Sequence, residues 1–453
     1  MDASRGVGPL GIGGVMALAV GLLVLLVGLL VSIGLHELGH MIPAKRFGVR
    51  VSRYMIGFGP TLWSHTWGDT EYGIKAIPLG GYVKIVGMLA PAEAVGAKPK
   101  SGVLGQMMQD ARDASAEEIL PGEEDRAFYR LSTPKKIVVM ASGTLTNLVV
   151  AVLLFGIVLV GLGLPGAAST TVGTTLPCVL PVDAPADREC TAQDPPAPVA
   201  LADLRVGDVL LSYGGVPIES WDDFLAAVQA VDGGDIPLVV ERSGEQVTLE
   251  VSPIVVERPV RDDAGDPLVG PDGEIVTEQS RYIGFSPTSV RERQPVGEVL
   301  PTVGDAVSGT LDLIVHLPWR LWDLAGSMIS GGERDASVMG LVGMGQVAGN
   351  IATADGPGIE VADRVALMLY LVASLNVALF AFNLIPLLPL DGGHVAGALW
   401  EGAKRQVARR RGRPRPPPVD MARMMPLANG VFVVLILLGL FLVVADIVSP
   451  VTG

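Results

Sequence analysis

Long apolar runs separated by polar stretches form the dominant pattern of this chain. Four of the runs are long enough to cross the hydrocarbon core of a bilayer as helices, which takes about 20 residues. They predict transmembrane helices over residues 10–42, 137–164, 365–392 and 427–448. The first run exceeds the apolar core of a typical secretory signal peptide and lacks a small-residue cleavage site, so we interpret it as a retained helix.

The segments between the runs differ in pattern, and each pattern predicts a different structure. Within the loop 43–136, residues 54–86 read as strands bounded by glycines and prolines. Residues 168–258 predict a compact β-rich domain with one or two helices. In the linker that follows, 259–364, residues 296–332 show a helical pattern with tryptophans among few charges, so we expect an amphipathic helix in the membrane interface.

A fifth membrane span over residues 296–332 is the competing interpretation. It is disfavoured by two acidic residues, a proline and an arginine, namely Asp305, Asp312, Pro318 and Arg320. The predicted fold class is therefore a polytopic α-helical membrane protein. It has about four transmembrane helices, a membrane-associated β-region and a separate β-rich domain.

Composition and charge add an orientation to this plan. The chain has 453 residues, of which 49% are hydrophobic and 18% charged, as expected for a membrane protein with a soluble part. Its formal net charge of −14 argues against nucleic acid as a partner. All eight lysines lie before residue 137 or after residue 400. Because basic loops stay in the cytoplasm, we expect 43–136 and the basic loop 393–426 inside, and the acidic stretch 165–364 outside.

The two cysteines, Cys178 and Cys190, fall in the stretch expected outside the membrane. That compartment is oxidising, so a disulfide between them is compatible with the topology. Closing so short a loop would stabilise the fold by about 3 kcal/mol at most. Two free buried thiols are the alternative.

A polar cluster, His36-Glu37-Leu38-Gly39-His40, ends the first apolar run. Histidines at i and i+4 lie on one face of a helix, about 6 Å apart along its axis, so both imidazoles can bind one zinc ion. Glu37 can then act as a base toward water. A solvated helix face would explain such a pattern in a soluble protein, but residues 17–33 before it carry no charge.

Zinc in hydrolases usually has three protein ligands, so a third is expected. Asp391 is the best candidate, because it closes the third apolar run at the same depth from the inner face as His40. The alternative is an aspartate that merely begins a turn with the two glycines after it. Of the other histidines, His394 is expected to support the site, whereas His65 and His316 have no assigned role in it.

These motifs resemble those of the site-2 proteases, in particular the bacterial RseP-like intramembrane zinc metalloproteases. Residues 36–40 match the HExxH motif, and residues 383–394 look like the NxxPxPxLDG signature. Residues 54–86, with GFGP and PLGGYVK, resemble the membrane-associated β-region, and residues 204–251 look like a PDZ domain on the outer side. The chain departs from the pattern at residues 143–147, where GTLTN stands in place of Gly-Pro-x-x-Asn.

The resemblance implies a bacterial plasma-membrane enzyme that hydrolyses a peptide bond within the transmembrane segment of a single-pass protein. The typical substrate is an anti-sigma factor of a stress response, already cut on its outer side by an upstream site-1-type protease. The resemblance also implies Zn2+ as the cofactor, with the active site near the cytoplasmic side. It gives His36, His40 and Asp391 as the zinc ligands and Glu37 as the catalytic base.

Candidate substrate-binding residues come from two regions. Asn383 and Asn376 could hold the substrate backbone, with helix–helix hydrogen bonding as the alternative for both. An extended substrate could add as a strand to the edge of the sheet at 54–86, which includes Gly80 and Gly81. The outer PDZ-like domain would either read a new C-terminus or exclude bulky uncut ectodomains.

Three rival interpretations are weaker. A metalloprotease with a soluble active site would need a third ligand on a helix beyond HExxH in the same domain, and the sequence has no apt helix there. A PDZ-bearing membrane scaffold with an inactive metal site would tolerate loss of a ligand or of the base, yet the whole set is intact. A transporter is disfavoured by four spans without a visible inverted repeat.

Overall fold

The computed structural model describes residues 12–98, 101–180, 190–191, 193–231, 233–260, 276–330, 338–354 and 360–448. The chain forms two compact units. The first comprises Met1–Gly161, Gln294–Thr353 and Arg364–Gly453, and the second comprises Leu162–Arg293 and Ala354–Asp363. The long stretch between the second and third apolar runs therefore contributes to both units.

The first unit is mainly helical. Its elements are α1 (Ile12–Arg46), β1 (Val51–Trp67), β2 (Thr70–Ile85), α2 (Ala92–Val95), α3 (Val103–Ala116), η1 (Glu124–Arg126), η2 (Phe128–Arg130), α4 (Thr133–Gly156), the π-helix η3 (Ile157–Leu162), η4 (Val296–Glu298), α7 (Val299–Ser330), α8 (Leu341–Thr353), α9 (Val361–Asn383), α10 (Asp391–Arg410), η5 (Met421–Met424) and α11 (Met425–Val448). The last residue of η3 and the first three of α9 belong to the second unit.

Within the described residues, four helical stretches are long and apolar enough to cross a membrane. They are Ala19–Arg46, Thr133–Leu162, Val361–Asn383 and Met421–Val448. Lipid offers no hydrogen-bond partner to the backbone, so a spanning segment must satisfy its own peptide groups as a helix. The prediction of four spans is confirmed, and α7 is not among them. The chain is a multi-pass membrane protein.

The third span ends earlier than the sequence predicted. Helix α9 stops at Asn383, not at residue 392, and α10 begins at Asp391. The intervening segment contains Pro386 and Pro389, which lack a backbone donor and cannot continue a helix. Asp391 therefore stands in the first turn of α10 and not at the end of the third span.

The segment predicted as a basic loop, 393–426, is helical in its first half. Here α10 docks against α4 through the carboxylate of Glu401, which is only 2% exposed. Lys136 of α4 donates to its two oxygens at 2.9 and 3.0 Å, and Arg405 pairs with it at 2.7 Å, one helical turn on. The many arginines suggested a solvated loop, but Arg405 and Lys136 neutralise a buried acid that holds the helix in place.

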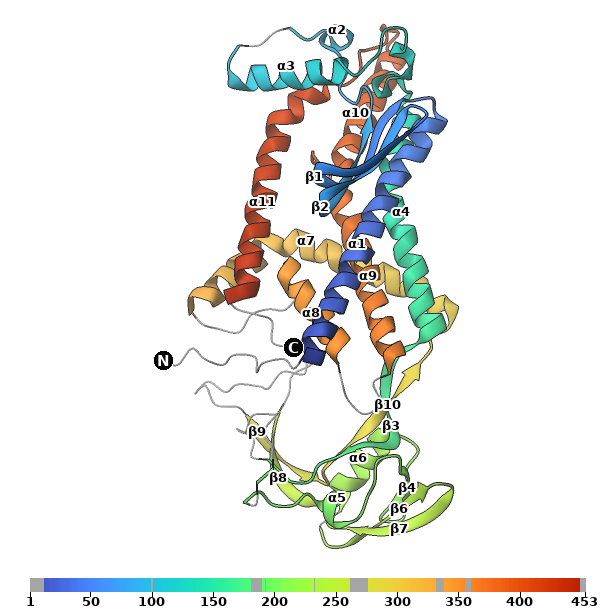
Figure 1. Cartoon of the computed structure of the whole chain (residues 1–453), viewed down its shortest axis with the longest axis vertical. Helices are drawn as coiled ribbons and strands as arrows, with labels where there is room; N and C mark the ends of the chain where they lie inside the picture. Colours follow the sequence, from blue (N-terminus) through green and yellow to red (C-terminus); the bar gives the residue numbers. More distant parts are fainter. Residues whose placement is uncertain are drawn as a thin grey trace. The chain divides into compact units, whose positions relative to one another are not determined.

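Strands β1 and β2 both fold back on themselves, so two strands form a sheet with four rows. Residues 51–56 pair with 81–85 on one side, and residues 53–56 pair with 71–74 on the other. The bend needs Gly57, whose φ is +90°, because a Cβ there would lie 2.7 Å from the carbonyl oxygen of Ile77. Figure 1 shows this sheet alongside α1, which it contacts through both strands.

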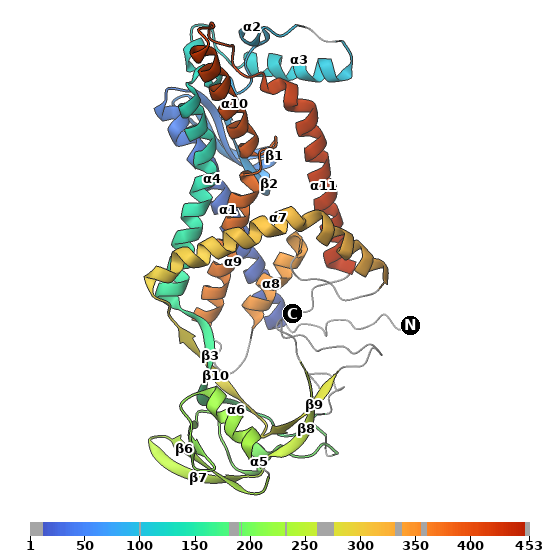
Figure 2. The ribbon, with the colours of Figure 1, turned by 180° about the vertical axis from the view of Figure 1, so that it is seen from behind.

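Helix α7 lies transverse to α4 and α11, which it contacts, as Figure 2 shows. Its two faces differ. Val299 and Leu324 are buried, whereas Trp319 and Trp322 are 77% and 80% exposed. The helix therefore packs with one face and presents tryptophans with the other.

The second unit is built around a sheet whose described strand pairs are all antiparallel. Its elements are β3 (Leu164–Thr175), α5 (Pro198–Leu201), β4 (Val209–Tyr213), β5 (Val216–Pro217), α6 (Trp221–Ala230), β6 (Ile236–Arg242), β7 (Glu245–Val251), β8 (Ile254–Pro259), β9 (Thr277–Tyr282) and β10 (Phe285–Glu292). The strand order is β10-β3-β4-β6-β7, with β5 on β4, while β8 and β9 form a separate pair. The sheet thus extends past the predicted domain, 168–258, because β10 returns to cover the edge of β3.

The second unit is stabilised by aromatic packing in its core and by a disulfide. Trp221 and Phe224 of α6 contact Phe285 of β10, with ring centroids 5.4 and 5.2 Å apart. Cys178 and Cys190 form a disulfide with their Cα atoms 6.0 Å apart. The disulfide interpretation of the two cysteines is therefore the one that the structure contains.

The contribution of one buried ion pair to the stability of this unit can be tested. Asp208 is 1% exposed and accepts hydrogen bonds from Arg242 at 2.7 and 2.8 Å. Burial by itself raises the pKa of Asp208, but the Arg242 guanidinium and the backbone N–H of Arg205 outweigh it and hold the pKa below its usual value. We expect Arg242→Ala to destabilise the unit by about 2–4 kcal/mol, because a buried carboxylate loses its partner.

Hydrogen exchange of the β4 and β6 amides in the intact, detergent-solubilised protein measures this loss. Because the pKa of Asp208 is lower in the folded state, its contribution is present above the unfolded value of about 3.9 and is lost as the pH falls below it. The difference in stability between the wild type and Arg242→Ala should therefore become smaller below about pH 4. The exposed Arg205–Asp203 pair supplies the control, since Arg205→Ala should change little. Equal protection in Arg242→Ala and wild type at pH 7 would contradict the assignment.

Candidate metal centre

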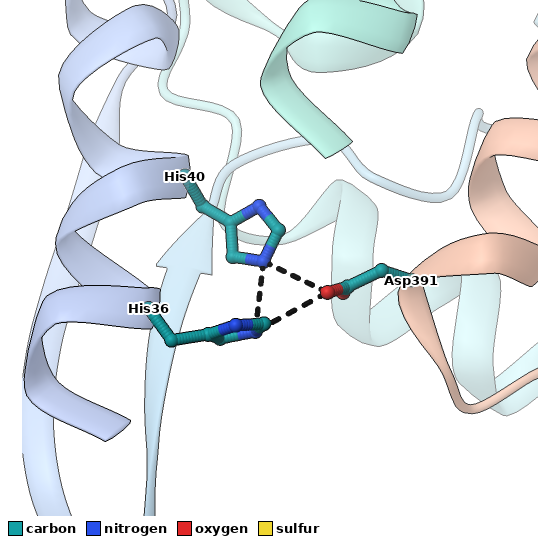
Figure 3. A group of neighbouring side chains, drawn as sticks. All are labelled: His36, His40 and Asp391. Carbon is teal, nitrogen blue, oxygen red and sulfur yellow. Dashed lines mark hydrogen bonds and ion pairs between the residues drawn. The ribbon is translucent and has the colours of Figure 1, made fainter. Parts of the chain in front are cut away.

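Three side chains from two helices converge on one point. His36 and His40 come from α1, and Asp391 comes from the first turn of α10 (Figure 3). The two Nε2 atoms are 3.2 Å apart, and each lies 3.2 Å from Oδ2 of Asp391. The side chains are only 12%, 5% and 18% exposed, respectively. Within the described residues this is a set of ligand atoms that could hold a metal ion.

The spacing of these atoms fits zinc. Ligand atoms about 2.0–2.1 Å from one tetrahedral ion would lie roughly 3.3 Å apart. Two imidazoles and one carboxylate are also a donor set that zinc hydrolases use, with the fourth position left open. The residues present therefore match the group in type, number and spacing.

The tautomer of His40 is set by the backbone of α4. Its Nδ1 lies 2.8 Å from the carbonyl oxygen of Val139, which can only accept a hydrogen bond. Nδ1 must therefore carry the proton, which leaves a lone pair on Nε2 directed at Asp391. The carboxylate is supported from the same helix, because Oγ1 of Thr144 donates to its Oδ2 at 3.1 Å.

Close packing of α1 on α4 makes this geometry possible. A Cβ on Gly39 would meet Oγ1 of Thr146 at 2.5 Å and the Cα of Gly143 at 2.9 Å, so the two helices approach at a pair of glycines. On α4, Gly143 faces the ring of His40, and a Cβ there would overlap the imidazole. The His40 imidazole therefore occupies space that is free because residue 143 has no side chain.

Glu37 lies between the two histidines and faces the sheet. The backbone of Val83 in β2 hydrogen-bonds to it. A Cβ on Gly81 would lie 3.6 Å from the Cγ of Glu37 and 3.0 Å from Ile33, so β2 runs close along α1 at this point. The sheet consequently brings main-chain groups next to the carboxylate that the sequence marks as the base.

The remaining sequence candidates have partners outside the converging set. Asn376 is fully buried and donates to Oγ of Ser32 in α1 at 2.8 Å, a helix–helix hydrogen bond. Asn383 ends α9 and donates to the carbonyl of Leu379 at 3.0 Å. Gly80 has a φ of +107° and packs under the ring of Phe58, where a Cβ would come within 2.5 Å.

The other histidines lie outside the converging set. His394 follows Asp391 by one turn of α10. His65 is in β1, opposite Tyr72 of β2. His316 is an exposed residue of α7 that pairs with Asp312 at 3.1 Å.

Sequence reasoning missed the contribution of α4. Thr144 contacts Asp391, and the amide of Asn147 lies 3.2 Å from Nδ1 of His36. The available signal was a buried asparagine and two threonines inside an apolar run, where polar side chains are costly and face protein. This signal indicates that Asn147 faces protein, but it does not identify the helix that Asn147 contacts.

This geometry defines a class: an HExxH metalloprotease whose histidines lie on a helix long enough to span a membrane. The family profile of peptidase family M50 matches residues 24–425. Zinc metalloprotease Rip1 of Mycobacterium tuberculosis is 34% identical over 447 residues, covering 96% of this chain and 99% of that protein. Metalloprotease MmpA of Caulobacter vibrioides is 28% identical over 404 residues, covering 86% and 89%. The chain therefore belongs to peptidase family M50, and the resemblance to the site-2 proteases is confirmed.

Membership in this family makes the chain a zinc metalloprotease. The prediction of zinc as the cofactor and of an enzyme is confirmed. A scaffold with an inactive metal site is accordingly not the better interpretation.

The glycine that receives the His40 ring gives a direct test of the centre. We expect Gly143→Ala to displace the imidazole and lower zinc affinity by at least about tenfold, as changes next to metal ligands commonly do. Zinc per purified chain and competition with a chelator measure the effect.

Gly156 on the same helix is the matched control. A Cβ there meets open space, and alanine favours a helix, so Gly156→Ala should keep the zinc affinity of the wild type. If both variants bind zinc as the wild type does, the packing of Gly143 against His40 does not hold the ligand.

Proposed function

We propose that this enzyme hydrolyses a peptide bond within the transmembrane segment of a single-pass membrane protein. The observation that carries the proposal is the position of the metal centre. Its two histidines belong to a stretch that is apolar enough to span a membrane, and its aspartate follows the end of another. A site placed there would reach a substrate helix from the side.

We assign one role to each residue of the centre. His36, His40 and Asp391 hold zinc, which when bound supplies a Lewis acid for the scissile carbonyl and for the attacking water. Glu37 takes the proton of that water and returns it to the leaving amine nitrogen. Asp391 and His36 are less deeply buried than His40, so we propose that water and substrate approach from their side.

A helical substrate hides its carbonyls in backbone hydrogen bonds, so it must unwind before cleavage. We propose that the unwound segment adds as a strand to β2 at residues 81–85. This row pairs with β1 on one side, and in the described register no strand occupies its other side. The backbone of Val83 hydrogen-bonds to Glu37, and a Cβ on Gly81 would lie 3.6 Å from its Cγ, so a strand added here would pass the base. Gly80 shapes the turn into this row.

The two asparagines are assigned different proposed roles. Asn383 ends α9 shortly before Asp391 and is half-buried, so we propose that it holds the substrate backbone near the metal. Asn376 donates to Ser32 of α1 and is fully buried, which favours the alternative of joining two helices.

We propose that the active site lies toward the cytoplasmic side of a bacterial plasma membrane. The excess of lysine and arginine in 43–136 and 393–426 supports this orientation. The second unit would then be extracytoplasmic, where its Cys178–Cys190 disulfide is stable. The exposed Trp319 and Trp322 of α7 suit a membrane interface.

We propose that the second unit is a PDZ-like domain that filters substrates. Its edge strand β10 and helix α6 both border the aromatic core at Phe285, an arrangement compatible with peptide addition along the edge. The substrate we propose is an anti-sigma factor already cut outside the membrane by a site-1-type protease.

The role of Glu37 can be separated from zinc binding. The purified enzyme should cut a single-span substrate with a trimmed ectodomain, and mass spectrometry of the products should place the cut inside the span. Glu37→Gln should lose at least about 100-fold in rate, because it removes the proton acceptor, and should keep zinc. His36→Ala should lose both.

Retained cleavage in Glu37→Gln would remove Glu37 from the role of base. A cut outside the span would overturn the intramembrane assignment but leave the metalloprotease intact.

The filtering role predicts a dependence on substrate size. A substrate that keeps a folded ectodomain should be cut at least about tenfold more slowly than the same span with the ectodomain trimmed. Cleavage of both, side by side in one preparation, measures the ratio. Trimming that leaves a free outer C-terminus, compared with the same terminus amidated, distinguishes reading of the carboxylate from size exclusion. Equal rates for all substrates would contradict a filter of either kind.

A further inference from the structure

Asn147 of α4 is a buried amide placed against a metal ligand from outside the ligand set. Its Nδ2 lies 3.2 Å from Nδ1 of His36, and the residue is fully buried. Its Oδ1 is also buried and has no hydrogen-bond partner among the described residues. A buried amide with one end on a ligand ring and the other end unpaired calls for a physical account.

The recorded orientation conflicts with metal binding. If Nδ2 donates to Nδ1 of His36, the ring must carry its proton on Nε2. That is the atom 3.2 Å from His40 Nε2 and from Asp391 Oδ2, and a protonated nitrogen cannot bind a metal ion. His40 has the opposite tautomer, fixed by the Val139 carbonyl.

Turning the amide by half a rotation removes the conflict. The two ends of an amide are nearly equal in shape, so hydrogen bonding decides which end faces the ring. With Oδ1 toward His36, the amide accepts the Nδ1 proton and Nε2 is left with a lone pair. The turn exchanges one unpaired polar atom of Asn147 for another, so it sacrifices no hydrogen bond of the recorded structure.

We propose that Asn147 is a positioning residue that, through its amide oxygen, holds His36 in the tautomer that binds zinc. With it, α4 supports all three ligands: Val139 holds His40, Thr144 holds Asp391, and Asn147 holds His36. Thr144 and Asn147 are three residues apart, so their side chains lie on the same face of α4, whereas Val139 acts through its backbone carbonyl. The inference rests on the proposed role of His36 as a ligand.

Two replacements of Asn147 separate acceptance from packing. Asn147→Leu keeps approximately the same shape but removes the acceptor, and should lower zinc affinity by about 10- to 100-fold, as loss of partners behind metal ligands does. In Asn147→Asp the ionised carboxylate has no donor and can only accept hydrogen bonds, so the zinc affinity should stay within about threefold of that of the wild type. Zinc affinity is measured on the full-length detergent-solubilised enzyme by competition with a chromophoric chelator. Asn147→Ala replaces the leucine variant if that one does not purify as a folded protein.

Ser32→Ala is the matched control for helix packing. It removes a buried hydrogen bond between α1 and α9, four residues before His36, without touching a ligand. It should leave zinc affinity within about threefold of the wild type. A tenfold loss in Ser32→Ala would show that helix packing, and not the Asn147 contact, determines the affinity.

The remaining outcomes are equally decisive. Wild-type affinity in Asn147→Leu, or an equal loss in Asn147→Leu and Asn147→Asp, would overturn the inference. His36→Ala distinguishes this failure from a failure of the proposed ligand set. If His36→Ala loses zinc while Asn147→Leu keeps it, only the role of Asn147 is wrong. If His36→Ala keeps zinc, the ligand assignment itself is wrong.

Discussion

The close packing of α1 against α4 is the constraint on which the metal centre depends. Two imidazoles and a carboxylate have to meet among apolar helices, where each polar group left without a partner costs about 1–3 kcal/mol. The glycines at 39 and 143 let the helices approach closely enough for main-chain and side-chain groups of α4 to reach the ligands. Without that approach the ligands would be present in the sequence but not held.

Helix α4 also holds the helix that carries Asp391. Glu401 of α10 is buried against Lys136 of α4, so the start of α10, where Asp391 lies, is held to the same surface that receives His40. A buried ion pair adds little net stability, because desolvation offsets most of the attraction. The ion pair instead fixes how α10 is aligned along α4, because Glu401 finds its cationic partner on α4 at Lys136.

The parts of the site that the sequence revealed are those whose signal is local. The histidines are one helical turn apart, and their spacing alone predicts that they bind one metal ion. Asp391 was found because an apolar run ends at it, even though the run breaks at Asn383 and the aspartate opens the next helix. The four spans follow from length and hydropathy, which depend on no tertiary contact.

The parts that the sequence did not reveal depend on which surfaces meet. The sequence of residues 139–147 does not show that α1 and α10 pack against this part of α4. The arginines near Glu401 are typical of a solvated loop, although the segment is a helix packed on α4. Strand β10 is separated from β3 by more than a hundred residues, so its pairing could not be read from either segment. The entropic cost of closing a loop grows only slowly with its length, so distant strands can pair almost as readily as near ones. Neither segment therefore carries a local sequence signal of the pairing.

The departure from the family pattern at position 144 has a physical meaning in this light. Where the pattern carries proline, this chain carries Thr144, whose hydroxyl donates to Asp391 at 3.1 Å. Proline has no donor in its side chain and none on its backbone nitrogen, so it could not make this bond. Threonine instead continues the helix while serving the carboxylate. A position at which this chain departs from the family pattern therefore contacts the metal centre directly, through a hydrogen bond that proline could not make.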